Sequence, residues 1–342
     1  MESPKRIIQN LHLANAQGAA TPIKVPASPF LKRLGYGTGV SVYCLERAPR
    51  PTGQPSSPWA IKRVSRQIKT DKEKSKLFNE RILKEAEILR QLEHPNIVGF
   101  RAISQEKDGI DTLALECCST SLGMLLEQRY DDELNALPAR HIRRMIIDIS
   151  SALDYLHTEA KLLHGDVKSH NILVKGDFEI CKLCDFGVSL PLNYDGVVNS
   201  KENPQLHYVG TIAWCAPEVI SEEDIIDAKA EIFSFGLVIY ETLALVPPHS
   251  LNSNDSTNKD FLKDAEDDPS LSVVDDDEET PGDLTLMEIP YGTRPPLPEV
   301  FDFDDEYNVI IELFYVCTNS SPDDRPTAKV IVNSLVKESC DK

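Results

Sequence analysis

Residues 164–171 read HGDVKSHN, and this stretch decides how the rest of the chain is interpreted. It places a carboxylate (Asp166), an ammonium (Lys168) and an amide (Asn171) within six residues, directly after a glycine. A second carboxylate, Asp185 of CDFG, follows nineteen residues after Asp166. Mg²⁺ prefers oxygen ligands that it shares with substrate phosphates, so two carboxylates and an amide near one place suit it. A single Asp is commonly a cap or turn residue, but that reading does not explain the whole ordered set.

The segments upstream of this stretch predict a small antiparallel β region. FLKRLGYG, VSVYCLER and WAIKRV are short, strand-like and separated by Gly- and Pro-rich turns. The glycines of LGYGTGVSVY let backbone N–H groups approach phosphate oxygens, although such hairpins are also common structural turns. Lys62 closes WAIK, and Glu85 on the next predicted helix could hold it as a fixed positive charge.

Helical periodicity dominates the second half of the chain. The predicted helices cover 73–92, 139–157, 227–245, 306–318 and 327–336, and the one at 227–245 is apolar on all sides and therefore expected to be buried. The first of them has apolar residues at Leu77, Ile82, Leu83, Ala86, Leu89 and Leu92. NILVKG and EICKLCDF, which separate HGDVKSHN from DFG, predict a hairpin. The fold class is therefore α+β, with a small β-rich lobe followed by a larger helical lobe.

Composition excludes a general nucleic-acid-binding role. The chain has 342 residues, 41% of them hydrophobic, and a formal net charge of −19. Residues 251–290 hold thirteen acidic residues and two lysines, a local charge of −11, which predicts a disordered insert. Two readings of this insert stay open, a docking segment for basic partner surfaces and a solvated spacer.

The chain shows no signal peptide and no apolar stretch long enough to span a bilayer, which predicts an intracellular protein, cytoplasmic or nuclear, with reduced thiols. Cys181 and Cys184 form its one C-x-x-C, but on a strand this spacing points them to opposite faces, which does not favour zinc. Residues 1–27 are expected to be a disordered tail. Ser3 and Thr21 in that tail and Ser28 just after it each precede a proline, as sites for an upstream proline-directed kinase do, although such pairs also occur by chance.

Taken together, these motifs resemble those of the eukaryotic protein kinases over about residues 30–336. The order is a glycine loop, A-x-K at 60–62, a helix Glu, H-x-D-x-K-x-x-N at 164–171, DFG at 185–187, GTIAWCAPE at 210–218 and DDRPT at 323–327. The phrases PASPF, LLHGDVKS, KGDFE, LCDFGVSLPL and GTRPP closely resemble one member of the mitogen-activated protein kinase kinase-like enzymes. The resemblance implies a bilobal fold, with the N-lobe at 28–116, the C-lobe at 117–338 and a tail at 339–342.

The resemblance also implies residue roles, with ATP and Mg²⁺ as cofactors. Asp166 accepts or orients the proton of the substrate hydroxyl, Lys168 steadies the γ-phosphate, and Asn171 and Asp185 hold Mg²⁺. Lys62, fixed by Glu85, contacts the α- and β-phosphates. The implied ATP-binding residues are Leu34, Gly35, Tyr36, Gly37, Thr38, Gly39, Val40, Ser41, Val42, Ala60, Lys62, Glu85, the gatekeeper Leu115, and the hinge residues Glu116 and Cys118.

Four positions depart from the family pattern. Gly165 stands where most kinases have an Arg that reads a phosphorylated activation loop, which implies a different activation logic. Val40 occupies the third glycine position, and Glu231 replaces the usual Asp of the buried helix, a mild change because a carboxylate remains. The chain closes with VKESCDK, whose charged end does not favour binding to a PDZ domain.

We therefore expect an active Ser/Thr protein kinase, with tyrosine as a further acceptor left open and a link to mitosis implied by resemblance alone. The expected partners are protein substrates, with no nucleic acid and no membrane. A catalytically silent pseudokinase is the alternative, and the presence of Lys62, Asp166, Asn171 and Asp185 argues against it. The GTIAWCAPE segment, which positions a peptide in this family, argues against a small-molecule phosphotransferase.

Overall fold

A computed structural model of the chain describes residues 32–37, 39–47, 56–65, 68, 71–105, 111–201, 203–204, 206–250, 290–298 and 303–340. Several sequence expectations lie outside these residues: the tail at 1–27, the candidate phosphosites Ser3, Thr21 and Ser28, the loop residue Thr38, and the acidic segment 251–290 except Pro290.

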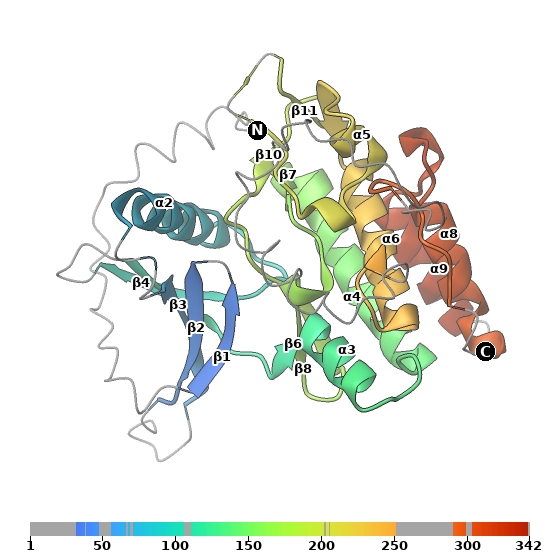
Figure 1. The fold of residues 1–342 in the computed structure, drawn as a ribbon, viewed down its shortest axis with the longest axis horizontal. Helices are drawn as coiled ribbons and strands as arrows, with labels where there is room; N and C mark the ends of the chain where they lie inside the picture. The colour runs from blue at the N-terminus through green and yellow to red at the C-terminus, as the bar shows by residue number, and fades with distance from the viewer. Residues whose placement is uncertain are drawn as a thin grey trace, which may run out of the picture.

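The N-terminal lobe is a five-stranded antiparallel sheet with one long helix packed against it (Figure 1). The strand order is β1-β2-β3-β5-β4. The elements are β1 (Lys32–Gly37), β2 (Val40–Leu45), β3 (Trp59–Val64), α2 (Lys72–Leu89), β4 (Phe100–Gln105) and β5 (Asp111–Glu116). Strand β3 is central, because it pairs with β2 through Val42↔Lys62 and with β5 through Lys62↔Leu113. This pairing fixes the backbone of Lys62 in the middle of the sheet.

Helix α2 begins at an Asp cap and presents a different inner face from the one that its leucines suggest. The Asp71 carboxylate accepts hydrogen bonds from the N–H groups of Glu73 and Lys74, both at 3.1 Å. The buried residues of the helix are Phe78, Ile82, Glu85, Ala86, Ile88 and Leu89. Leu77 and Leu83 are 47% and 38% exposed. The helix ends at Leu89 rather than at 92, so Leu92 lies beyond it.

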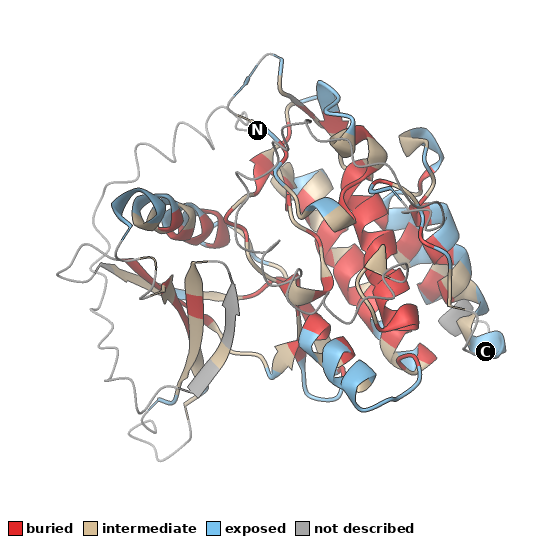
Figure 2. Ribbon diagram, viewed as in Figure 1, coloured by how far each residue is buried: buried red, intermediate tan, exposed pale blue. Residues whose placement is uncertain are grey.

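The C-terminal lobe is mainly helical, as predicted, and is built around helix α6. Its helices are α3 (Leu122–Asp131), α4 (Ala139–Tyr155, continued by a π-helical turn, Leu156–Ala160), α5 (Pro217–Ile220), α6 (Lys229–Ala244), α8 (Asn308–Cys317) and α9 (Ala328–Cys340). Every residue of α6 after Lys229 is buried, which confirms the expectation from its apolar sequence (Figure 2). Helix α9 extends two residues into the segment expected as a tail. None of the helices in the described part of the chain is both long and apolar enough to cross a membrane.

Short strands position the loops that carry the motifs. They are β6 (Thr120–Ser121), β7 (Leu162–Leu163), β8 (Ile172–Lys175), β9 (Ile180–Leu183), β10 (Leu190–Pro191), β11 (Val197–Asn199) and β12 (Ile225–Asp227). The predicted hairpin is β8–β9, which pairs antiparallel and extends to β6. Strand β7 directly precedes the HGDVKSHN stretch, and β10 follows the DFG segment. Because β7 pairs with β10, these two motifs lie in the same region. The bilobal α+β fold expected from the sequence is confirmed.

Candidate active site

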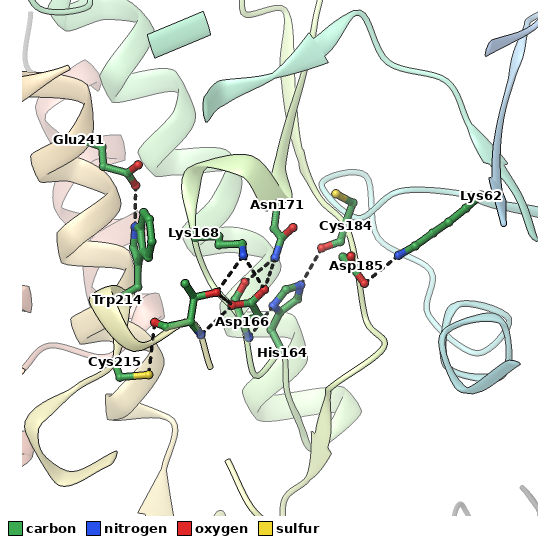
Figure 3. A network of polar contacts seen from close by, with 11 residues as sticks. Lys62, His164, Asp166, Lys168, Asn171, Cys184, Asp185, Trp214, Cys215 and Glu241 are labelled. Carbon is green, nitrogen blue, oxygen red and sulfur yellow. Dashed lines mark hydrogen bonds and ion pairs between the residues drawn. The ribbon is translucent and has the colours of Figure 1, made fainter. Parts of the chain in front are cut away.

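The HGDVKSHN loop is organised by its buried histidine. The Nδ1 atom of His164 accepts a hydrogen bond from the Asp166 N–H at 3.2 Å, and Nε2 lies 2.8 Å from the Cys184 carbonyl oxygen (Figure 3). Because a carbonyl only accepts, Nε2 carries the proton and the ring is the neutral tautomer. The fully buried ring of Phe186 meets His164 edge-on at 4.9 Å between centroids. One histidine therefore connects the backbone of the HGDVKSHN loop (164–171, the candidate catalytic loop) to that of the DFG segment.

Gly165 is a glycine for two reasons, which explains the departure from the Arg of most kinases. Its φ is +86°, and a Cβ at this position would lie 2.8 Å from the Val188 carbonyl oxygen. Its N–H donates to Glu231 Oε1 at 2.7 Å, and Glu231 Oε2 lies 2.7 Å from His157 Nε2. The loop is thus anchored to the buried helix α6 through the glutamate that replaces the usual Asp.

Asp166 lies at the centre of a polar cluster (Figure 3). Its Oδ1 accepts hydrogen bonds from the N–H of Thr211 at 3.1 Å and from its Oγ1 at 2.6 Å. Its Oδ2 accepts from Asn171 Nδ2 at 2.8 Å and lies 3.3 Å from Lys168 Nζ. Burial disfavours its charged form, but Lys168 and the Thr211 hydrogen bond outweigh burial and lower the pKa of Asp166. The carboxylate is therefore ionised and fixed in orientation at neutral pH.

Thr211 was not identified as a site residue from the sequence, although its segment was. Its Oγ1 also accepts a hydrogen bond from Lys168 Nζ at 2.8 Å. Thr211 therefore forms hydrogen bonds with both Asp166 and Lys168 of HGDVKSHN. Its position in G-T, at the start of the segment 210–218, is the sequence signal that could have identified it.

Asn171 and Asp185 have the chemistry that a hard divalent cation needs. Both hydrogen bonds of the Asn171 side chain, to the Asp166 carbonyl and carboxylate at 2.8 Å, are donated by Nδ2. The Asn171 Oδ1 therefore remains suited to a metal. Asp185 has φ +69°, and its Oδ1 pairs with Lys62 Nζ at 2.8 Å. Lys62 outweighs the effect of burial and lowers the pKa of Asp185 to about 2. The donor set fits Mg²⁺.

The predicted pair of Lys62 and Glu85 is present as a buried ion pair. The Lys62 Nζ lies 2.7 Å from Glu85 Oε2, and the Glu85 residue is only 1% exposed. Burial opposes the ammonium, but Asp185 and Glu85 outweigh it and raise the pKa of Lys62. For Glu85 burial outweighs Lys62, and the nearby Asp185 adds to it, which raises its pKa to about 7. One ammonium is thus shared by two carboxylates, one from each lobe.

The carboxylate of the hinge residue Glu116 forms ion pairs with basic side chains of several elements. Its carboxylate lies 3.0 Å from Lys182 Nζ, 3.6 Å from Lys175 Nζ and 3.9 Å from an Arg101 nitrogen. These cations outweigh burial and lower the pKa of Glu116. The neighbouring Cys118 is partly buried, and burial raises the pKa of its thiol to about 11. The hinge thiol is therefore protonated at neutral pH.

The remaining predicted ATP-binding residues lie on the N-terminal sheet and the chain that leaves it. Leu34, Gly35, Tyr36 and Gly37 are in β1, Gly39 is in the turn, Val40, Ser41 and Val42 are in β2, Ala60 is in β3, and Leu115 is in β5. Leu115 pairs with Ala60 across β3 and β5.

Helix α6 also contributes Glu241, which the sequence did not single out. Its two carboxylate oxygens accept hydrogen bonds from Ser169 Oγ at 2.6 Å and from Trp214 Nε1 at 2.8 Å. Burial raises the pKa of Glu241 to about 7. The residue joins the catalytic loop to the 210–218 segment, and no local pattern around position 241 signals that contact.

A two-lobed fold with a sheet lysine held by a helix glutamate, beside an Asp–Lys–Asn loop and a second Asp, defines a phosphotransferase of the protein kinase class. The protein kinase domain model matches residues 30–336, so the chain belongs to the protein kinase family. The human lymphokine-activated killer T-cell-originated protein kinase is 43% identical over 318 residues, 92% of each chain.

Two further relatives have lower identity to this chain. The dual specificity mitogen-activated protein kinase kinase mek-2 of Caenorhabditis elegans is 30% identical over 262 residues, 73% of this chain and 62% of that protein. The mitogen-activated protein kinase kinase kinase dlk-1 of Caenorhabditis briggsae is 31% identical over 170 residues, 49% of this chain and 18% of that protein. The resemblance to mitogen-activated protein kinase kinase-like enzymes is therefore confirmed.

Proposed function

We propose that the chain transfers the γ-phosphate of ATP to Ser or Thr hydroxyls of protein substrates. The observation that carries this proposal is the Asp166 carboxylate, which is ionised and held by donors from Thr211, Asn171 and Lys168. A carboxylate held in this way is a preorganised acceptor for the proton of a substrate hydroxyl. The human relative with 43% identity, named a protein kinase, supports the same activity.

On the acceptor side, Asp166 would accept a hydrogen bond from the hydroxyl and orient its oxygen toward the phosphorus atom. Lys168, next to Asp166 and Thr211, would balance the negative charge that develops on the transferred group. The proton of the hydroxyl would pass to Asp166. Positioning and charge neutralisation, rather than covalent chemistry by the protein, would supply most of the catalysis.

On the donor side, Lys62 would bind the α- and β-phosphates, because Glu85 and Asp185 fix its ammonium from two directions. Asn171 Oδ1 and the Asp185 carboxylate would hold Mg²⁺, which neutralises phosphate charge when it is bound. The adenine would lie against the hinge between Leu115 and Cys118, as in related kinases.

Tyrosine is a second candidate acceptor, and a relative favours it. The similar mek-2 protein is named a dual specificity kinase, and it matches 73% of this chain. The two readings differ in one product, phosphotyrosine, so a single measurement separates them.

The test is phosphoamino acid analysis of a peptide library incubated with purified protein, labelled ATP and Mg²⁺. We expect phosphoserine and phosphothreonine. A Lys62→Met variant serves as the control for contaminating kinases, because it removes the ammonium of the ATP site. Phosphotyrosine alone, or equal labelling by the Lys62→Met variant, would overturn the proposal.

A further inference from the structure

The tip of the glycine loop is packed against an aromatic side chain of helix α2. A Cβ built on Gly39 would overlap Cε2 of Phe78 and lie 2.6 Å from its Cζ, well inside van der Waals contact. The Phe78 ring therefore lies directly on the backbone of Gly39. Phe78 is 8% exposed and belongs to the main hydrophobic core.

The turn that Phe78 contacts is also fixed from the other side. Gly37 pairs with Val40 in the β1–β2 hairpin, so Gly39 is the residue of the turn just before β2. Its φ of +81° is one that glycine adopts without strain. The Gly39 carbonyl accepts a hydrogen bond from the N–H of Ser65, just after β3, at 2.8 Å. The turn is thus held between the end of β3 and α2, and its position depends on both elements.

The same helix face carries the partner of the ATP-site lysine. Phe78 and Glu85 are seven residues apart, close to two turns, so they lie on one side of α2 about 10.5 Å apart along its axis. Arg81, between them, places its guanidinium carbon 5.5 Å from the centre of the Phe78 ring. A movement of α2 that separates Glu85 from Lys62 would therefore also withdraw the support of Gly39.

We propose that Phe78 is a positioning residue for the ATP phosphates. Through its contact with Gly39, the Phe78 ring couples the inward position of α2 to the position of the glycine loop over the triphosphate. Helix α2 would then position both Lys62, through Glu85, and the glycine loop, through Phe78. The inference rests on the ATP site proposed above.

The test compares binding of adenosine and of Mg²⁺-ATP to three variants. Phe78→Ala should weaken Mg²⁺-ATP binding about tenfold while adenosine binding stays within about twofold, because in the proposed ATP site only the phosphates would lie under the turn. Phe78→Leu should retain most of the ATP affinity. Leu77→Ala is the matched control, since Leu77 is the adjacent residue on the exposed face of α2, and it should change neither affinity.

A double-mutant cycle tests the contact itself. Gly39→Ala should cost more ATP affinity in the wild-type chain than in the Phe78→Ala background, where the ring no longer opposes the methyl group. Equal costs in both backgrounds, or parallel losses of adenosine and ATP affinity in Phe78→Ala, would overturn the inference. If Phe78→Ala fails to fold, Phe78→Leu replaces it in the cycle: Gly39→Ala should cost less ATP affinity in the Phe78→Leu background than in the wild-type chain, and equal costs would overturn the inference. Wild-type protein that binds no ATP would instead refute the proposed ATP site.

Discussion

The two lobes hold their halves of the site in different ways. In the C-terminal lobe, the catalytic loop is bonded to the fully enclosed helix α6 through Glu231 at Gly165 and Glu241 at Ser169. In the N-terminal lobe, Lys62 depends on α2, a helix with one buried and one exposed face. The acceptor half of the site is therefore built into the core, whereas the donor half depends on where one helix lies.

The two lobes also differ in the interactions that their buried carboxylates make. The α6 carboxylates are satisfied by hydrogen bonds from backbone and side chains of the catalytic region. Glu85 and Asp185 instead share one ammonium. Burial, with the nearby Asp185 adding to it, raises the pKa of Glu85, whereas Lys62 lowers the pKa of Asp185. Changes in the C-terminal anchors should therefore affect folding, while changes in the N-terminal pair should affect turnover.

The largest effect on folding is expected for Glu231→Ala. It removes a buried carboxylate and leaves the Gly165 N–H and His157 without their partner, so the free energy of unfolding should fall by about 3–5 kcal/mol. Urea denaturation measures it. Glu231→Asp keeps a carboxylate and should lose less than half as much. A loss of less than about 1 kcal/mol in Glu231→Ala would show that the loop does not depend on this carboxylate.

Glu241→Gln should change how stability depends on pH. The pKa of Glu241 is raised by burial from 4.5 to about 7, so the folded state binds the proton more tightly than the unfolded state. Its stabilising contribution is therefore fully present below about pH 4.5 and is lost as pH rises through about 7, a change on the order of 3 kcal/mol.

Urea denaturation of both proteins between pH 5 and 8 measures this effect. The difference in unfolding free energy between wild type and Glu241→Gln should favour the wild type most at pH 5 and shrink toward pH 8. A difference that stays constant across this range would contradict the raised pKa.

Glu85→Gln should reduce turnover while leaving the fold intact. Neutralising one of two carboxylates that share Lys62 relieves their repulsion, so the free energy of unfolding should change by less than about 1 kcal/mol. The kcat should fall about 10²-fold, because the variant removes the ion pair through which α2 orients Lys62. Steady-state kinetics and a thermal melt measure the two quantities. A large loss of stability with unchanged kcat would reverse the proposed contrast between the lobes.

The smallest effect is expected for deletion of residues 253–283, which the sequence predicts to lie outside the catalytic core. The Tm should move by no more than about 2 °C, and basal peptide phosphorylation should be unchanged. If the acidic segment docks partners, the KM for a basic protein substrate should rise with kcat little changed. An unchanged KM across several basic substrates favours a spacer, and loss of folding on deletion refutes the predicted disorder.

The sequence was informative wherever a motif is contiguous or strongly periodic. The bilobal fold and the buried helix α6 followed from such patterns. The inner face of α2 did not, because Leu77 and Leu83 interrupt the stripe that Phe78 and Ile82 form in the structure. Apolar residues on both sides of a helix leave its orientation undetermined until the sheet is in place.

Contacts between distant segments were the part that the sequence did not reveal. Glu241 reaches Ser169 across 72 residues, and Thr211 reaches Asp166 across 45. Such pairings depend on how α6 and the 210–218 segment pack in three dimensions. Strands β7 and β10 have two residues each, and β11 and β12 have three, which is too short for alternation to be recognised.

The most direct measurement is γ-phosphate transfer by Asp166→Asn, with Mg²⁺-ATP binding measured on the same protein. Asn keeps the shape of the side chain but removes the ionised acceptor that Thr211, Asn171 and Lys168 hold in place. We predict that ATP binding survives while turnover falls by at least ~10²-fold. Transfer at near-wild-type rates by this variant would contradict the assignment of Asp166 as the proton acceptor.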